Sequence, residues 1–255
     1  MLRLNYIWSR LSKLHQYIIK HLLLTVKFLL LLFPLLCSYC FAQETVERDR
    51  KLSPQVTEKY NVLKSDYTVL QGQYSAYLKK KLLAAGKYEK NKRTGVWTFF
   101  NKQGTPCQRF NYDSNSLVFE SGPDSTIKIL YMVDDSLKNN PRFTRPIRVG
   151  GLYYGFLPYA NLVRLPKDYW ELNNEMSSVT MEILVSPYGR LAEFKLRIRP
   201  YNAPFSDNDA VFNFNINLLD ADDKVFVPAT LNKEPISVRM IIPCRFNGVD
   251  RIELL

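Results

Sequence analysis

Short runs in which apolar and polar side chains alternate fill the middle of the chain, and they predict β-strands joined by tight turns. Residues 96–100 form such a run, and the Asn-Lys-Gln-Gly that follows at 101–104 is typical of a hairpin turn. A Gly-x-Tyr step at Gly72 returns at Gly86, 14 residues later. We therefore expect a short repeat of β-hairpins, in which each hairpin buries its apolar face against its neighbours.

Beyond the repeats, the pattern mixes helical and strand periods. Residues 152–163 place their apolar side chains on one helical face, and Pro166 suits the first turn of a second short helix over 165–170. Residues 179–186 and 191–198 alternate on either side of a Pro-Tyr-Gly-Arg turn, which predicts a β-hairpin.

Two more elements follow this hairpin. Ser206 is an N-cap candidate with Asp207 and Asp209 in the next turn, which predicts a helix that runs to about Leu219. The last long apolar run, residues 236–246, predicts a strand. The order helix, hairpin, helix, strand belongs to the α+β class.

The first 42 residues contain both histidines, five basic residues and no acidic residue, so the formal charge of +11 falls to +6 for the remainder. An apolar run at 28–37 has the length of the hydrophobic region of a secretory signal and is too short to span a bilayer comfortably. Cys40 and Ala42 supply small side chains at positions −3 and −1 of a cleavage site. This predicts a signal peptide over 1–42 and a mature chain that begins at Gln43.

Two alternatives to a cleaved signal remain open. An uncleaved signal anchor over residues 22–42 would be just long enough to span the inner membrane and would tether the chain there, with Lys27 near one interface. A lipoprotein is the other alternative, because Cys37 and Cys40 lie near the end of the apolar run, although bulky residues precede both. All three interpretations place the body of the chain in the periplasm or cell envelope.

The remaining body has no histidine, which excludes His-dependent triads and His-ligated metal sites within the chain. It also lacks a Gly-x-Ser-x-Gly elbow, a phosphate loop and a Cys-x-x-Cys pair, so we expect no enzyme, no cofactor and no metal. The cluster of Asp220, Asp222 and Asp223 lacks the glycine and terminal glutamate of an EF-hand, which favours a solvated turn over a calcium site. Basic residues form a block only at 79–81, which does not indicate nucleic-acid binding.

Two cysteines, Cys107 and Cys244, remain in the body. They could pair in an oxidising compartment, but nothing in the sequence sets their separation. Two small buried side chains are the favoured interpretation.

The hairpin segment over residues 72–112 resembles degenerate MORN-type repeats of the YwqK antitoxin-component kind. Such repeats combine Gly-x-Tyr, a polar turn, Gly-x-Trp and an aromatic strand that ends in an Asn/Asp-x-x-Gly turn. The residues that carry this pattern here are Gly86, Tyr88, Gly95, Trp97, Phe99, Phe100, Asn101 and Gly104. Aromatic side chains at strand spacing are usually core residues, and a face for a ligand or partner is the alternative.

The segment over residues 148–247 resembles the C-terminal domain of TonB energy transducers of the Bacteroidetes type. The matching positions are Gly150-Gly151, 156–159, Asn161-Leu162, Leu165-Pro166, the hairpin 178–196, the stretch 226–229, Asn232, Pro243 and Phe246. The chain departs from the family at Phe226, where tryptophan is usual, and at Lys233, which replaces a turn glycine. Neither His15 nor His21 has the serine four residues earlier that a transducer's motor-facing helix carries.

The TonB resemblance implies a three-stranded antiparallel sheet packed by two helices, with one sheet edge that accepts an extended peptide as an added strand. In that family the peptide belongs to an outer-membrane receptor. The resemblance places the accepting edge on Ser237, Val238, Arg239, Met240, Ile241 and Ile242. The alternatives are that the chain's own tail, 248–255, or a second copy in a homodimer covers this edge.

These observations together predict a non-enzymatic envelope protein that binds an envelope protein or receptor peptide. A TonB-type energy transducer anchored in the inner membrane and driving outer-membrane transport is the alternative. The expected division is a signal peptide over 1–42, a polar lead-in over 43–70, MORN-like hairpin repeats over 71–125, a linker with one strand over 126–147 and a TonB-like domain over 148–255.

N-terminal sequencing of the native protein tests the signal prediction. We expect a terminus at Gln43, because the residues before it have the order of a cleavable signal. A terminus within the first 42 residues in the native protein would contradict cleavage and would favour the anchored transducer.

Overall fold

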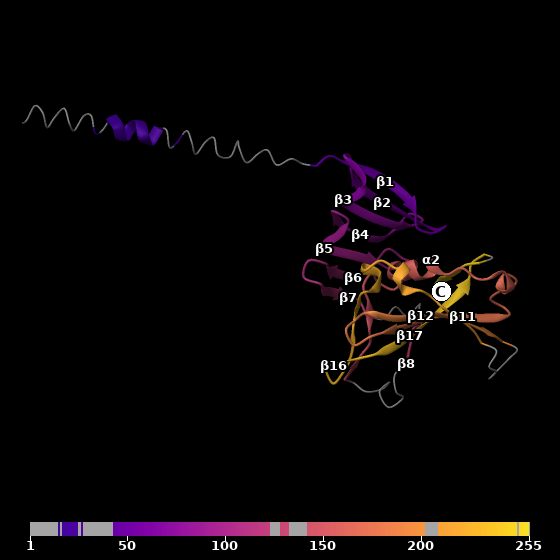
Figure 1. The fold of residues 1–255 in the computed structure, drawn as a ribbon. Helices are drawn as coiled ribbons and strands as arrows, with labels where there is room; N and C mark the ends of the chain where they lie inside the picture. The colour runs from indigo at the N-terminus through magenta and orange to yellow at the C-terminus, as the bar shows by residue number, and fades with distance from the viewer. Residues whose placement is uncertain are drawn as a thin grey trace, which may run out of the picture. The chain divides into compact units, whose positions relative to one another are not determined.

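The computed structural model describes residues 15, 17–24, 27, 43–122, 128–132, 142–201, 209–248 and 250–254. The chain divides into a unit over residues 1–44 and a unit over 45–255, and the described strands all belong to the second (Figure 1). The expected cleavage site after Ala42 lies outside the described residues. Within the described part of the chain, no helix combines the length and the apolar character needed to cross a membrane.

The first sheet is a seven-stranded antiparallel meander in which each strand pairs with the next along the chain. Its strands are β1 (Thr45–Lys51), β2 (Val56–Leu63), β3 (Asp66–Leu78), β4 (Lys81–Glu89), β5 (Lys92–Phe100), β6 (Pro106–Asn111) and β7 (Ser116–Glu120). Lys90 and Asn91 join β4 to β5 and both have positive φ, as tight type I′ hairpins require. The strand and turn expected over 96–104 are confirmed, and the Asn101 side chain accepts backbone hydrogen bonds within that turn.

The segment 43–70 belongs to this sheet, so the expectation of a polar lead-in is wrong. It forms β1, β2 and the start of β3. Val56 and Val62 of β2 are buried, while nearly all of β1 is exposed. The strand pattern is hard to detect in the sequence because so few apolar side chains anchor these strands.

The second sheet has six strands in the order β13-β12-β11-β17, with β8 and β18 both paired to the outer side of β17. The strands are β8 (Leu130–Met132), β11 (Ser177–Val185), β12 (Leu191–Pro200), β13 (Ala210–Asn213), β17 (Val238–Phe246) and β18 (Ile252–Leu254). The hairpin expected over 179–198 is confirmed as β11 and β12, and the long last strand is confirmed as β17. The sheet is larger than the three strands that the TonB resemblance implies.

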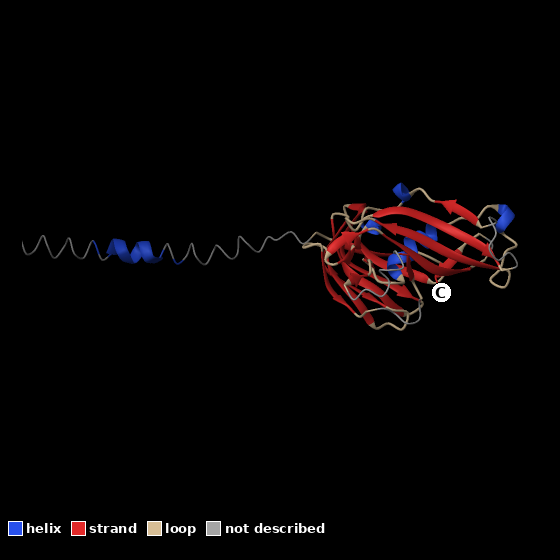
Figure 2. Ribbon diagram, turned by 90° about the horizontal axis from the view of Figure 1, so that it is seen from below, coloured by secondary structure: helices blue, strands red, loops and turns tan. Residues whose placement is uncertain are grey.

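Short helices and small sheets connect these strands, and antiparallel β-structure dominates the fold (Figure 2). The helical segments are η2 (Tyr154–Phe156), α2 (Leu157–Leu162), η3 (Lys167–Tyr169), η4 (Ile216–Leu218) and η5 (Asp222–Lys224). The small sheets pair β10 (Ile147–Arg148) with β14 (Phe226–Val227), and β15 (Ala229–Leu231) with both β9 (Phe143–Thr144) and β16 (Glu234–Ile236). The helix expected over 152–163 is confirmed as η2 and α2, and Pro166 precedes the single turn of η3.

The helix expected to run from Ser206 to Leu219 is wrong in its described part. Residues 210–213 form the strand β13, and only 216–218 form a helical turn; Ser206 itself lies outside the described residues. Exposure alternates with a period of two along residues 210–216, as in a strand. Pairing with β12 therefore outweighs the capping signal in this segment.

One hydrophobic core joins the two sheets. Trp97 and Phe99 of β5 are fully buried, and Tyr154 of η2 stacks on Phe99 with ring centroids 5.8 Å apart. The inward face of β11, represented by Met181 and Ile183, belongs to the same core. Figure 1 shows α2 where the two sheets meet. The repeats and the C-terminal segment therefore bury each other's apolar faces.

A buried glutamine reinforces this junction. The Gln108 side chain of β6 is 1% exposed, and its carbonyl oxygen accepts hydrogen bonds from the backbone N–H groups of Gly150 at 2.8 Å and Gly151 at 3.1 Å. Its amide nitrogen donates to the Arg148 carbonyl at 3.0 Å and to Glu120 at 2.9 Å. The two glycines have φ values of 115° and 71°, which side chains other than glycine rarely adopt.

The Gly-x-Tyr step of the repeat has a steric basis that mutation can test. A Cβ on Gly86 would overlap the indole ring of Trp97, so we expect Gly86→Ala to lower the free energy of unfolding by about 3 kcal/mol. On a Trp97→Val background the overlap disappears, and the same substitution should cost less than about 1 kcal/mol. Chemical denaturation of all four variants measures this coupling, and equal losses on both backgrounds would contradict the steric explanation.

Candidate functional site

The strand assigned to partner binding lies inside the second sheet, so the expectation of a free edge there is wrong. β17 pairs with β11 on one side; on the other, residues 239–241 pair with β8 and residues 244–246 pair with β18. The tail of the chain thus covers part of the strand, as one alternative proposed, and a segment of the expected linker covers the rest. Pro243, which has no N–H to donate, lies between these two covering strands.

The six residues predicted for this edge divide by the face on which they lie. Val238, Met240 and Ile242 are buried in the core. Arg239 and Ile241 point to the opposite face of the sheet, where they line an open groove, and Ser237 is exposed just before β17 begins. The strand therefore contributes to a surface through two side chains, not through its backbone.

The groove has a volume of about 670 Å³ and crosses β8, β17, β11 and β12. Its lining residues are Leu130, Met132, Ser178, Thr180, Glu182, Lys195, Arg197, Arg199, Arg239 and Ile241. Leu130 and Met132 are more than half exposed, so one end of the groove offers apolar contact. This volume lies within the range of roughly 300–1,000 Å³ that is common for ligand sites.

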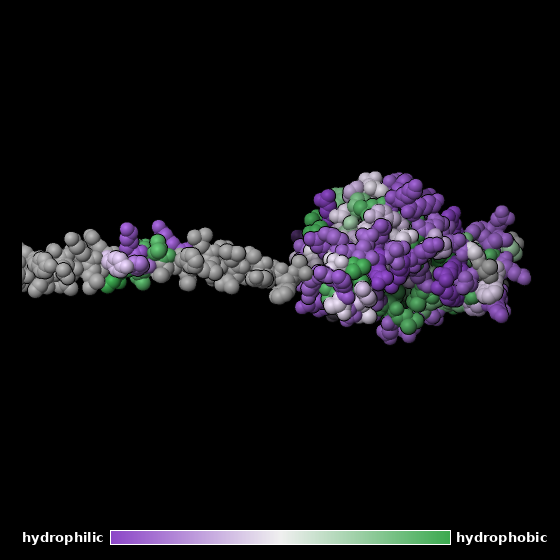
Figure 3. Space-filling view, turned by 90° about the horizontal axis from the view of Figure 1, so that it is seen from above, coloured by the Kyte–Doolittle hydropathy of each residue, from purple (hydrophilic) through white to green (hydrophobic). Residues whose placement is uncertain are grey.

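Basic side chains dominate the accessible part of the groove. The side chains of Arg199 and Arg197 are 58% and 32% exposed, whereas those of Glu182 and Asp209 are only 7% and 14% exposed. The carboxylates are therefore less accessible than the guanidinium groups, and a molecule in the groove would contact the positive charges first. Elsewhere, the face seen in Figure 3 is largely hydrophilic, with hydrophobic side chains in small patches.

Ion pairs hold these side chains in place. Asp209 contacts Arg199 at 2.7 Å and Arg197 at 3.0 Å, and Arg239 contacts Glu193 at 2.6 Å. Hydrogen bonding from Arg199, supported by Arg197, lowers the pKa of Asp209 to about 2. Hydrogen bonds from Lys195 and Arg239 likewise lower the pKa of Glu193. The carboxylates of Asp209 and Glu193 therefore stay ionised and hold the neighbouring arginine and lysine side chains in place.

Of the residues that line the groove, the sequence predicted only Arg239 and Ile241, and it indicated no site on β12. Lys195, Arg197 and Arg199 occupy alternate positions of β12, so the strand period places all three on one face. The alternation of these basic residues is visible in the sequence. The pairing of β12 with the other strands that form the groove is not.

The aromatic residues of the repeats mainly build the core, as the favoured interpretation held. Trp97 and Phe99 are 0% exposed, and the indole N–H of Trp97 donates to the Lys87 carbonyl at 3.2 Å. Tyr74 packs against Trp97 with ring centroids 5.1 Å apart. Tyr88 also contacts Trp97 but stays partly exposed and lines a second cavity.

The acidic cluster after η4 is not a simple solvated turn. Asp223 is 9% exposed, lies 3.3 Å from Arg148 and 3.9 Å from Arg93, and has its pKa raised by burial. Its backbone carbonyl accepts a hydrogen bond from Tyr159 at 2.7 Å. The cluster thus anchors two arginines rather than facing only solvent.

No disulfide joins Cys107 to Cys244. Cys244 is buried in β17, and burial raises its pKa to about 12, so its reactive thiolate form is scarce. Cys107 lies on β6 and is partly exposed.

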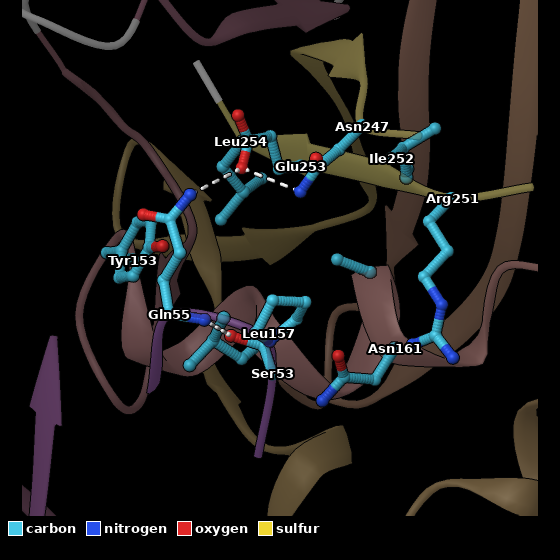
Figure 4. Close-up of a pocket in the computed structure, with 12 residues that line it drawn as sticks. Ser53, Gln55, Tyr153, Leu157, Asn161, Asn247, Arg251, Ile252, Glu253 and Leu254 are labelled. Atoms are coloured by element: carbon cyan, nitrogen blue, oxygen red, sulfur yellow. Dashed lines mark hydrogen bonds between the residues drawn. The ribbon is translucent and has the colours of Figure 1, made fainter. Parts of the chain in front are cut away.

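A small cavity of about 30 Å³ separates the Ser53–Gln55 turn, α2 and β18, and Figure 4 shows its lining. The side chains of Gln55 and Asn247 both reach Glu253, with the Asn247 amide donating at 3.0 Å. A cavity of this size holds about two waters. Its polar side chains therefore fasten the C-terminal strand to the first sheet and leave no room for a larger ligand.

Comparison with known proteins gave no match to any protein-family model, any curated protein or any solved structure.

The groove carboxylates predict a pH dependence. Asp209 has a folded pKa of about 2, below its ordinary value of 3.8, so its stabilising effect is present above about pH 4 and is lost as the pH falls toward 2. We expect Asp209→Asn to flatten the loss of stability between pH 4 and pH 2, in chemical denaturation measured at both values.

The matched control for this measurement is Asp168→Asn, which removes an exposed carboxylate from η3. It should leave the wild-type slope in place. Equal slopes for wild type and Asp209→Asn would contradict the pairing.

Proposed function

We propose that the chain is a non-enzymatic binding protein of the cell envelope, which holds an extended, acidic segment of a partner protein in the groove of the second sheet. The observation that carries this proposal is the set of accessible cations on β12 and β17, which are held by less exposed carboxylates. Guanidinium groups recognise carboxylates with paired, charge-assisted hydrogen bonds. An acidic segment therefore complements the groove in charge.

The two ends of the groove differ in the side chains that they expose, and this difference indicates which kind of segment the groove suits. Leu130 and Met132 are 62% and 56% exposed at the β8 end, while Arg197 and Arg199 lie toward β12. A segment that combines acidic side chains with one or two apolar ones matches both ends. An envelope protein or an outer-membrane receptor peptide is the class of partner that the TonB resemblance and the leader support.

The groove chemistry favours binding over catalysis. Glu182 contacts Arg197 and Arg239, Glu193 contacts Lys195 and Arg239, and Asp209 contacts two arginines. The lowered pKa values of Glu193 and Asp209 make these two carboxylates weak general bases and keep them from acting as general acids.

A binding measurement tests the proposal. Two labelled peptides of equal length, one alternating Glu with Leu and the other Lys with Leu, are titrated with the full chain in fluorescence anisotropy. We expect only the acidic peptide to bind, and to bind more weakly at high salt. Arg239→Gln should weaken its binding about tenfold, which corresponds to ~1.4 kcal/mol.

The matched control is Arg109→Gln, which removes the same charge from an exposed position of β6. It should change affinity by no more than about twofold, because an isolated surface charge contributes little. Equal binding of both peptides, or equal effects of the two substitutions, would contradict the groove as the site. Arg199→Gln provides a second groove variant if Arg239→Gln fails to fold.

A further inference from the structure

A second cavity, separate from the groove in its lining, lies between the first sheet and α2. It has a volume of about 130 Å³. The residues that line it include Arg50, Glu58, Tyr74, Tyr88, Arg93 and Tyr154. They come from β1 to β5 and from η2, so both parts of the fold contribute to the cavity.

A chain of hydrogen bonds runs along one wall of this cavity. Tyr74 donates its hydroxyl proton to Glu58 at 2.6 Å, so Tyr154, whose hydroxyl lies 2.7 Å from that of Tyr74, must donate in turn to Tyr74. Arg50 donates to the other oxygen of Glu58. The Glu58 carboxylate, which is 3% exposed, retains lone pairs that can accept further hydrogen bonds.

The facing wall is built around one guanidinium group. Arg93 donates from Nε to the Tyr88 hydroxyl at 3.2 Å and from Nη1 to the Tyr112 hydroxyl at 2.9 Å. Both phenols act as acceptors in these bonds, so the O–H of Tyr88 is left to donate within the cavity that it lines. The Nη2 group lies 3.9 Å from Asp223, beyond hydrogen-bond distance, and keeps its protons for an occupant.

Charges of both signs surround the cavity. Arg50 pairs with Glu58, and Arg93 at 3.9 Å and Arg148 at 3.3 Å both approach Asp223, with Asp220 also in the lining. A charged occupant would compete with these ion pairs for its counter-ion. A neutral occupant rich in hydroxyl groups would not, because each hydroxyl can accept from Arg93 and donate to a carboxylate.

We propose that this cavity binds a neutral polyhydroxyl ligand, such as a single sugar unit. Its volume is about ten times the 10–15 Å³ that one water needs, so it accommodates a cluster of waters that sugar hydroxyls can replace bond for bond. Apolar side chains at Leu52, Leu157 and Pro158 provide contact for the carbon atoms of the ring.

Saturation-transfer NMR on the full chain tests this proposal with glucose, N-acetylglucosamine and sorbitol as neutral probes, and with acetate and methylammonium as charged ones. We expect at least one neutral probe to bind and neither ion to compete with it. Tyr88→Phe keeps the ring but removes the donor in the cavity, and should weaken binding about tenfold, as loss of one hydrogen bond does.

Tyr112→Phe is the matched control, because its hydroxyl also accepts from Arg93 but does not line the cavity. It should change affinity by no more than about twofold. Asn161→Ala, which removes an amide from the lining, is a second variant that should weaken binding. Failure of every neutral probe, competition by either ion, or equal effects of the two phenylalanine variants would overturn the proposal. Because Tyr88 does not line the groove, Tyr88→Phe should leave peptide binding there unchanged, so the two proposals can fail separately.

Discussion

The buried amide of Gln108 forms four hydrogen bonds, and the junction of the two sheets depends on them. Two link β6 to the backbone N–H groups of Gly150 and Gly151, and two reach Arg148 and Glu120. Without this side chain, the backbone groups of Arg148, Gly150 and Gly151 would lose these partners, and each buried polar group left unpaired costs about 1–3 kcal/mol. The repeat sheet and the segment after it are therefore held in a fixed register, and the cavity between them has a defined shape.

Elements with strong local signals could be predicted from the sequence. The hairpin of β11 and β12 has apolar side chains at alternate positions over most of its length and a turn glycine, and β5 has closely spaced aromatics. The strand β1 was missed because it is almost wholly polar, and β2 because the charged Glu58 occupies one of its inward positions. The strand β13 was missed because the residues before it have the pattern of a helix N-cap. In each missed case the neighbouring strand, not the local pattern, decides the conformation.

The candidate site illustrates the same limit. The sequence placed Arg239 and Ile241 at a functional surface, and the structure brings both into the groove. The sequence could not show that β8, which is only three residues long and far from β17 in the chain, pairs with the backbone of these two residues. Because of this long-range pairing, the strand that was expected at a sheet edge lies inside the sheet, and the proposed partner would be recognised by side-chain charge instead of by backbone hydrogen bonds.

The exposed first strand has a consequence for assembly. Two copies of β1 meeting edge to edge about a twofold axis would align like faces, because cross-strand neighbours lie on the same side of a sheet. Arg48 and Arg50 share one face, so these two bases would oppose the same bases of the second copy, whereas Glu47, Asp49 and Lys51 share the other face. This opposition of like charges disfavours the pairing of two copies of the chain through β1.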